Sequence, residues 1–196
     1  MKQIVFLCLV VVGMAASAQA QNDYSKFELF GGYSYLHVDA GLSREASFLF
    51  TNGGIANGWN TSLSANVNQW FTLVADFSGH YGEIRNPIFP LNGTPRFGGV
   101  GFNRHSFLFG PRLSYRTRKG FTPFGHFLLG GAHDGGSIHP HSDTRLTWAL
   151  GGGLDLKVSK RLSLRLIQAD YVPIKAFEIQ NNVRISAGIV WHFGKK

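Results

Sequence analysis

The chain has 196 residues and a formal net charge of +8, with 19 Lys or Arg against 11 Asp or Glu. This length is enough for one sizeable domain. The basic residues are spread along the chain and the start of the chain indicates export, so we expect no nucleic-acid partner.

The first twenty residues have the pattern of a secretory signal peptide. Lys2 precedes an apolar run, and small residues at Ala18 and Ala20 suit signal peptidase. The alternative is a transmembrane helix, but the run is shorter than the roughly 20 apolar residues that span a bilayer. We expect cleavage of residues 1–20, which contain the only cysteine, and a single domain at 21–196 without a disulfide.

Beyond the expected signal, apolar residues alternate with small or polar ones, which is typical of strands. Each alternating segment is about long enough to cross a bilayer as a tilted strand. In chain order, we predict strands at residues 27–36, 59–67, 71–81, 105–115, 121–132, 146–158, 162–171 and 183–193.

The predicted connections alternate between short and long. Short links lie at residues 68–70, 116–120 and 159–161, and long ones at 37–58, 82–104, 133–145 and 172–182. Short periplasmic turns and long extracellular loops characterise outer-membrane barrels. We therefore predict an all-β fold, an eight-stranded antiparallel up-and-down transmembrane β-barrel with both chain ends in the periplasm.

A soluble eight-stranded barrel has the same periodicity with its apolar face inside. The polar face here carries charges of both signs among many Gly and Ser residues, and aromatic residues gather near strand ends as in interfacial belts. These features favour a membrane barrel with a polar lumen. We predict that its lumenal polar network comprises Glu28, Asp76, Arg112, His126, Asp155, Arg165 and Arg184.

For two pairs of residues in this network, the sequence also predicts how the two members lie relative to each other. Asp155 and Arg165 lie symmetrically about the turn at 159–161, so a hairpin would bring them face to face. Asp76 and Arg112 are expected at similar heights on neighbouring strands. An eight-stranded interior is just wide enough for side chains to fill, so we expect a plugged lumen; the alternative is a narrow pore for ions or small solutes.

Two prolines fall inside neighbouring predicted strands. Pro111 and Pro123 lack the amide hydrogen that a strand ladder uses, and a closed barrel has no free edge. A bulge or a shorter pairing is expected near them.

No catalytic or metal-binding motif is convincing. His133, His139 and His141 are weak metal candidates, but their spacing matches no closed site and a solvated loop is the plainer interpretation. Ser78 and His80 share a strand face without an identified oxyanion donor. His105 and Ser106, a second Ser and His candidate pair, are adjacent in a strand and therefore point to opposite faces. We expect neither an enzymatic activity nor a cofactor.

Four segments carry a family resemblance: residues 27–35 (FELFGGYSY), 109–112 (FGPR), 149–155 (ALGGGLD) and 188–193 (GIVWHF). With these segments, residues 27–193 resemble the small outer-membrane β-barrel domain family, which includes the eight-stranded OmpA-type transmembrane domain. The resemblance implies an outer-membrane location and a structural or surface-interaction role carried by extracellular loops.

Because the chain is basic and has the start of an exported protein, we expect outer-membrane lipids and lipopolysaccharide as its acidic partners. The resemblance implies a further partner during biogenesis, the barrel-assembly machinery, which reads a final strand with an aromatic end. Here Trp191 and Phe193 correspond to that signal, although residues 194–196 (GKK) follow it. A closed barrel leaves no edge strand to pair, so we expect a monomer, and the loop partner is unknown.

Overall fold

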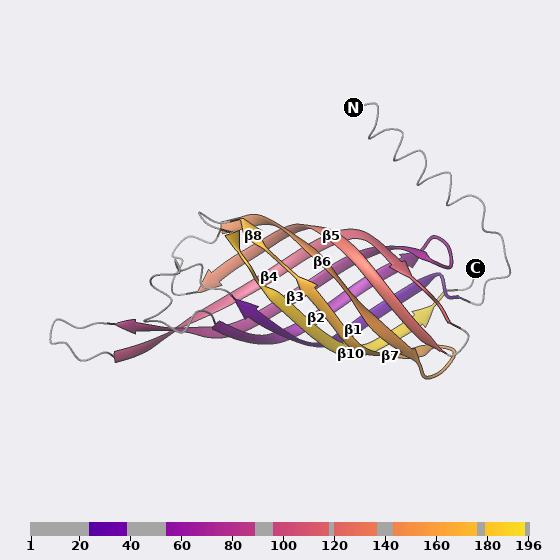
Figure 1. Ribbon diagram of the computed structural model, residues 1–196, viewed down its shortest axis with the longest axis horizontal. Coiled ribbons are helices and arrows are strands. Elements are labelled where there is room, and N and C mark those ends of the chain that lie inside the picture. Colours follow the sequence, from indigo (N-terminus) through magenta and orange to yellow (C-terminus); the bar gives the residue numbers. More distant parts are fainter. Residues whose placement is uncertain are drawn as a thin grey trace, which may run out of the picture.

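The computed structural model describes residues 24–38, 54–88, 96–117, 120–136, 143–175 and 179–194. Within this part of the chain, eight long antiparallel strands form one closed barrel (Figure 1), which confirms the predicted fold. They are β1 (Phe27–Val38), β2 (Gly54–Asn66), β3 (Phe71–Ile88), β4 (Arg96–Ser114), β5 (Phe121–Gly136), β6 (Asp143–Lys157), β7 (Leu162–Tyr171) and β10 (Val183–Phe193).

The topology is an up-and-down meander. Each long strand pairs with the next one along the chain, and β10 pairs with both β7 and β1, which closes the barrel. Two short strands, β8 (Ile174–Lys175) and β9 (Ile179–Gln180), pair with each other beside β6, inside a connection predicted to be a loop. The described residues contain no helix that is long and apolar enough to cross a membrane.

Local side-chain chemistry fixes the short turns. The side-chain oxygen of Asn68 accepts hydrogen bonds from the backbone N–H groups of Trp70 and Phe71. Ser159 Oγ accepts from the N–H of Leu162 in the same manner. Gly120 has a φ of +84°, which favours glycine because other residues are strained there. These turns coincide closely with the short links predicted from the sequence.

The strands next to the second long connection extend much further than predicted. β3 and β4 remain paired through Ile88 and Arg96, well into residues 82–104, and their hairpin protrudes beyond the barrel (Figure 1). In a two-stranded ribbon outside the barrel, neither face of the strands is turned toward a lumen or toward lipid, so alternate residues meet similar surroundings. The polar and apolar alternation that marks the other strands is therefore weak there, and the pattern indicated a loop.

A bulge in β7 changes which residues face the lumen. The register of β7 shifts by one residue against both β6 and β10, so Leu166 and Ile167 both lie exposed on the outer surface. Beyond the bulge, the inward face passes to Gln168 and Asp170, which are buried. One inserted residue in a strand has this effect because side chains alternate with a period of two.

The prolines disturb the ladder less than expected. Pairing between β4 and β5 is interrupted at Gly110 and Pro111, but the register on the two sides of the gap is the same. Pro123 still pairs opposite Leu154 of β6. The shorter pairing thus occurs at Pro111, whereas the bulge lies in β7 rather than beside either proline.

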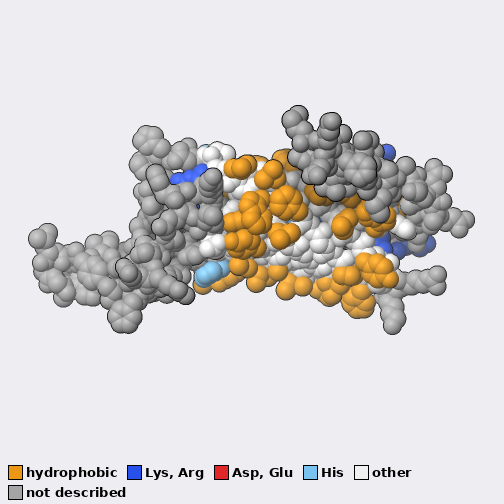
Figure 2. Space-filling view, turned by 45° about the horizontal axis from the view of Figure 1, so that its top comes forward, with side chains coloured by type: hydrophobic (Ala, Val, Ile, Leu, Met, Phe, Trp, Pro, Cys, Tyr) orange, Lys and Arg blue, Asp and Glu red, His pale blue; other side chains and the backbone are white. Residues whose placement is uncertain are grey.

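The outer surface is apolar and the interior is largely polar, the arrangement of a membrane barrel. Ile189 and Leu164 are 57% and 41% exposed, whereas Ser163 and Ser186 are buried in the lumen. On the face shown in Figure 2, hydrophobic side chains cover the middle of the barrel, and Lys and Arg side chains appear toward the ends. The expected facing is therefore present at these four positions, and it is reversed beyond the bulge of β7.

This facing predicts an asymmetric response to substitution. Ile189→Arg should lower the free energy of unfolding by about 2 to 4 kcal/mol if the residue lies near the bilayer midplane. Ser186→Ala, three residues away on the lumenal face, should cost less because it removes one hydrogen bond, to Ser34. Urea unfolding of the refolded barrel in vesicles measures both, and equal losses would contradict the assigned facing.

Candidate functional site: the lumenal polar network

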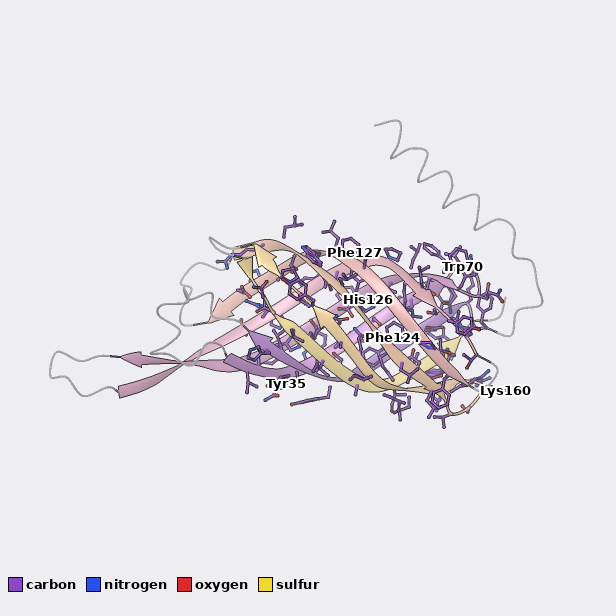
Figure 3. The ribbon with its side chains drawn as sticks, viewed as in Figure 1. Tyr35, Trp70, Phe124, His126, Phe127 and Lys160 are labelled. Carbon is purple, nitrogen blue, oxygen red and sulfur yellow. The ribbon has the colours of Figure 1, made fainter. Side chains whose placement is uncertain are left out.

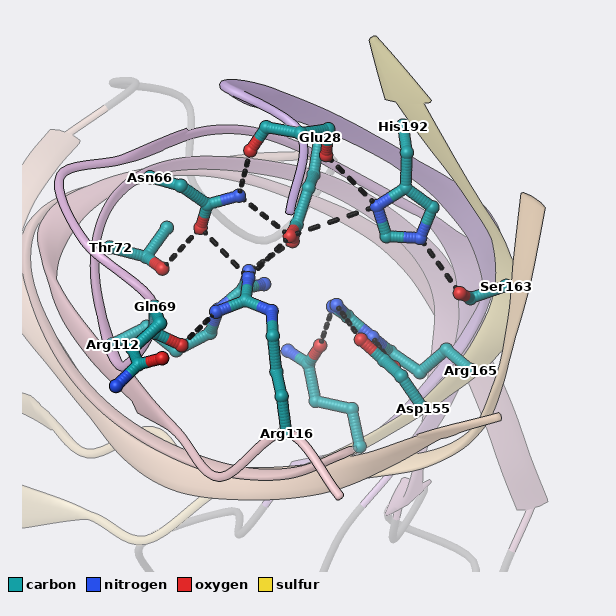
Figure 4. Close-up of polar contacts among 12 residues, drawn as sticks. Glu28, Asn66, Gln69, Thr72, Arg112, Arg116, Asp155, Ser163, Arg165 and His192 are labelled. Atoms are coloured by element: carbon teal, nitrogen blue, oxygen red, sulfur yellow. Dashed lines mark hydrogen bonds and ion pairs between the residues drawn. The ribbon is translucent and has the colours of Figure 1, made fainter. Parts of the chain in front are cut away.

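Charged side chains fill the end of the lumen that lies next to the short turns. Glu28 of β1 accepts hydrogen bonds from Arg112 of β4, from Arg116 Nη2 at 2.8 Å and from Asn66 Nδ2 at 2.8 Å. Figure 4 shows these side chains enclosed by the ribbon of the barrel wall. Since β2 and β3 separate β1 from β4 in the wall, the contact between Glu28 and Arg112 crosses the lumen.

The next layer is centred on Arg165. Its guanidinium donates two hydrogen bonds to Asp155, from Nε at 2.8 Å and from Nη2 at 3.1 Å, and a third to Gln168 at 2.7 Å. The same group lies 4.3 Å from the ring centroid of Phe30 and 4.5 Å from that of Phe124. Cation–π contacts with two buried rings and a two-pronged ion pair therefore hold this arginine in place.

Arg184 occupies the middle of the network. Its Nη1 donates to Asp76 at 2.7 Å, and its Nε and Nη2 donate to Asp170 at 2.9 and 2.7 Å. His126 Nε2 lies 2.7 Å from the other Asp170 oxygen, and Asn60 donates to Asp76 at 2.9 Å. Because β10 and β3 are separated by β1 and β2, Arg184 also bridges walls that are not neighbours in the sheet.

The far end of the lumen holds a smaller set of contacts. Arg104 donates to both oxygens of Asp134, at 2.5 and 3.1 Å. Ser34 Oγ lies 2.8 Å from His80 Nε2 and 2.9 Å from Ser186 Oγ. Polar contacts thus recur from one end of the barrel to the other.

Part of the wall is apolar on its inner side. A cluster of buried hydrophobic side chains completes the filling of the lumen: Val74, Leu108, Leu128, Ala149 and Val172. Buried ion pairs and buried apolar side chains therefore share the interior of the barrel. The arrangement can hold eight strands together and obstruct the lumen.

The structure places every residue of the predicted lumenal set inside the barrel, and it brings Asp155 and Arg165 together as expected. The expected common height of Asp76 and Arg112 is wrong. Thr72, not Asp76, lies opposite Arg112, because β3 begins directly opposite Leu113. The stagger of tilted strands separates residues that lie at similar distances from their own turns.

Several members of the network were missed. Strict alternation through β7 assigns Gln168 and Asp170 to the lipid face, and the bulge moves them inside. Two adjacent apolar residues at 166–167, followed by a carboxylate near the bilayer, were the available signal, because a charged group facing lipid is costly. Arg104 and Asp134 were missed because they lie where loops were predicted.

Ser163, His192 and Glu28 have the residue types of a serine hydrolase triad. Ser163 Oγ lies 2.7 Å from His192 Nε2. The nearest Glu28 oxygen is 3.8 Å from His192 Nδ1, too far for a hydrogen bond, and Ser25 Oγ is closer at 3.3 Å. Since Arg112 and Arg116 engage the Glu28 carboxylate, it does not orient the imidazole, and we assign these residues to the network.

The other candidates are placed differently. His133 lies at the outer surface, 3.1 Å from Thr144 Oγ1, while His139 and His141 fall outside the described residues. The described part of the chain contains no group of three metal-ligating side chains. Ser78 Oγ lies 2.6 Å from Ser106 Oγ, whereas His80 Nε2 contacts Ser34 Oγ, so Ser78 and His80 each bond to a different serine of the lumen. Residues 1–20 lie outside the described part.

Solved structures with the same fold are outer-membrane barrels. Neisserial surface protein A has a TM-score of 0.63 at 12% identity, with 86% of this chain and 98% of that chain covered. OprG from Pseudomonas aeruginosa has a TM-score of 0.57 at 11% identity, covering 89% and 100%. Ail, the attachment invasion locus protein of Yersinia pestis, has a TM-score of 0.52 at 15% identity, covering 87% and 99%.

The sequence itself also identifies a family. Among curated proteins, no sequence matches significantly. The family model described as "Outer membrane protein beta-barrel domain" matches residues 6–193, which include every strand of the barrel. A match of this extent, together with the closed eight-stranded fold, shows that the chain belongs to the outer membrane protein beta-barrel domain family.

Proposed function

We propose that this protein is a closed barrel that anchors extracellular elements in the outer membrane and serves a structural or surface-interaction role without enzymatic activity. The observation that carries the proposal is the lumenal network. Contacts between non-neighbouring strands cross the lumen at several heights, as in the pairs Arg112–Glu28, Arg184–Asp76 and His126–Asp170. A lumen crossed in this way obstructs ion flow.

The β3–β4 hairpin supports a role at the surface. Among the residues that the structure describes, 84–88 of β3 and 96–100 of β4 pair only with each other, because β2 pairs no further than Glu83 and β5 no further than Phe102. Within the described ranges no other strand pairs with the two edges of this ribbon, and unpaired strand edges are templates for pairing with another chain. Attachment, named for Ail, is a role of the same kind.

The proposal places the short turns in the periplasm after cleavage of residues 1–20. Trp191 and Phe193, at the end of β10, are 53% and 41% exposed on the outer surface. Phe193 stacks on Phe27 with ring centroids 5.6 Å apart, which ties the first strand to the last. This accessible aromatic end supports recognition by the barrel-assembly machinery, and the apolar outer surface supports contact with membrane lipid.

Planar-bilayer recording tests closure. Reconstituted protein at neutral pH should show no steps of conductance, or only tiny ones, because ion pairs and apolar side chains fill the lumen. An outer-membrane porin reconstituted in the same bilayers is the positive control. Reproducible conductance steps from the unmodified chain would contradict closure and favour a narrow pore for ions or small solutes.

A further inference from the structure

An apolar groove lies on the outer wall of β3 to β6, near the short-turn end of the barrel. Its volume is about 570 Å³, within the range of about 300 to 1,000 Å³ typical of small-molecule sites. Figure 3 labels three of its lining residues, Trp70, His126 and Phe127, and of these Trp70 and Phe127 lie along one edge of the barrel. Six of its nine lining residues have large apolar side chains, namely Trp70, Phe71, Pro111, Leu113, Phe127 and Leu150, and the other three are Gly125, His126 and Gly151.

The groove is hollow because bulky side chains surround Gly125. Gly125 lies opposite Leu113 on one side and Gly152 on the other. A Cβ on Gly152 would come within 2.4 Å of the Phe124 carbonyl oxygen, so close backbone packing accounts for that glycine. A Cβ on Gly125 would meet nothing closer than the Gly151 carbonyl oxygen at 3.7 Å. Packing within the barrel therefore does not require a glycine at 125.

A glycine in the interior of a strand weakens it and often marks close approach by a ligand. The groove belongs to the outer surface that this family exposes to the bilayer, and its lining is almost wholly carbon. Water would find too few polar partners to be stable there. The natural occupant of a carbon-lined groove facing lipid is a hydrocarbon chain.

We propose that the groove binds one acyl chain of a phospholipid from the leaflet next to the short turns. Trp70 lies in the β2–β3 turn, at the rim where indole rings favour the membrane interface. The assignment to a phospholipid rests on the proposed topology, in which the short turns face the periplasm and its phospholipid leaflet. Lipopolysaccharide occupies the opposite leaflet and would not reach this rim.

The walls of the groove are held in place before lipid binds. Trp70 and Phe71 make an edge-to-face contact with ring centroids 5.9 Å apart, and Phe127 lies 6.0 Å from Trp148. A preformed site lowers the entropy cost of holding a flexible chain. The bound phospholipid should consequently exchange more slowly than other lipids around the barrel and survive mild extraction.

The test fills the groove with a side chain. Gly125→Leu should fold, because its Cβ has room, and should occupy the space of the acyl chain. Gly31→Leu is the matched control: Gly31 is an exposed glycine of β1, away from the groove, and its Cβ would meet nothing within 4 Å. Native mass spectrometry would follow mild detergent extraction from native outer membranes, which keep phospholipid in the periplasmic leaflet and lipopolysaccharide in the outer leaflet.

The unmodified protein and Gly31→Leu should each retain a phospholipid, and Gly125→Leu should retain about tenfold less, a loss of roughly 1.4 kcal/mol in binding. Equal retention by all three, or none by the unmodified protein, would overturn the site. Retention of lipopolysaccharide in place of phospholipid would contradict the assignment of the groove to the phospholipid leaflet. A dimer of the unmodified protein that Gly125→Leu disrupts would show that a second copy of the chain fills the groove. These outcomes are independent of conductance, so closure of the lumen can fail separately.

Discussion

Replacing Arg184 with Met should lower the free energy of unfolding by about 3 to 5 kcal/mol, the typical cost of removing one partner from a buried ion pair. Arg184 is 1% exposed, and its guanidinium neutralises Asp76 and Asp170 together. Met retains an unbranched apolar stem but leaves two carboxylates facing each other across the lumen. Urea unfolding in lipid vesicles, followed by tryptophan fluorescence, measures the change.

A matched control separates this effect from the loss of a positive charge. Arg161 lies exposed in the β6–β7 turn, and Arg161→Met should change the free energy of unfolding by less than about 0.5 kcal/mol. Asp170→Asn added to Arg184→Met should recover part of the loss, because it removes one of the unpaired charges. Equal losses for the two arginine variants would show that Arg184 does not hold the walls together.

The strands were predictable because the bilayer and the lumen impose different chemistry on alternate residues. In β10, Ile185 and Ile189 face outward while Arg184 is buried, as the pattern predicts. Short turns were equally clear, since Asn68 and Ser159 are residues whose side chains bond to nearby backbone. Where neither lipid nor lumen acts on the chain, as in the ribbon of β3 and β4, the pattern fades.

The partners inside the lumen were predictable only where they are local. Asp155 and Arg165 belong to one hairpin, so a turn position was enough to bring them together. Glu28 and Arg112 are 84 residues apart in sequence, and their contact depends on how eight strands close and on the stagger between them. Alternation specifies which face a residue takes but not which residue lies across the lumen. A single bulge in β7 was then enough to place Asp170 in the lumen, although alternation assigned it to the lipid face.

The local pair offers the sharpest measurement of coupling in the lumen. We expect Asp155→Asn and Arg165→Met to show a coupling energy of about 0.5 to 3 kcal/mol in a double-mutant cycle, because each leaves its partner buried without its ion pair. The combined variant should be more stable than the two separate losses imply. Strictly additive losses in the free energy of unfolding would contradict this coupling.

The two single losses should differ in size. Asp155 loses mainly its contact with Arg165, whereas Arg165 also bonds to Gln168 and lies between the rings of Phe30 and Phe124. Arg165→Met should therefore be the more damaging change, and part of its cost should persist when Asp155 is already Asn. Arg165→Lys keeps the charge but not the planar fork, so it should recover only part of the stability. Full recovery by Lys would show that charge alone, without two-pronged bonding or ring stacking, holds β6 and β7 in register.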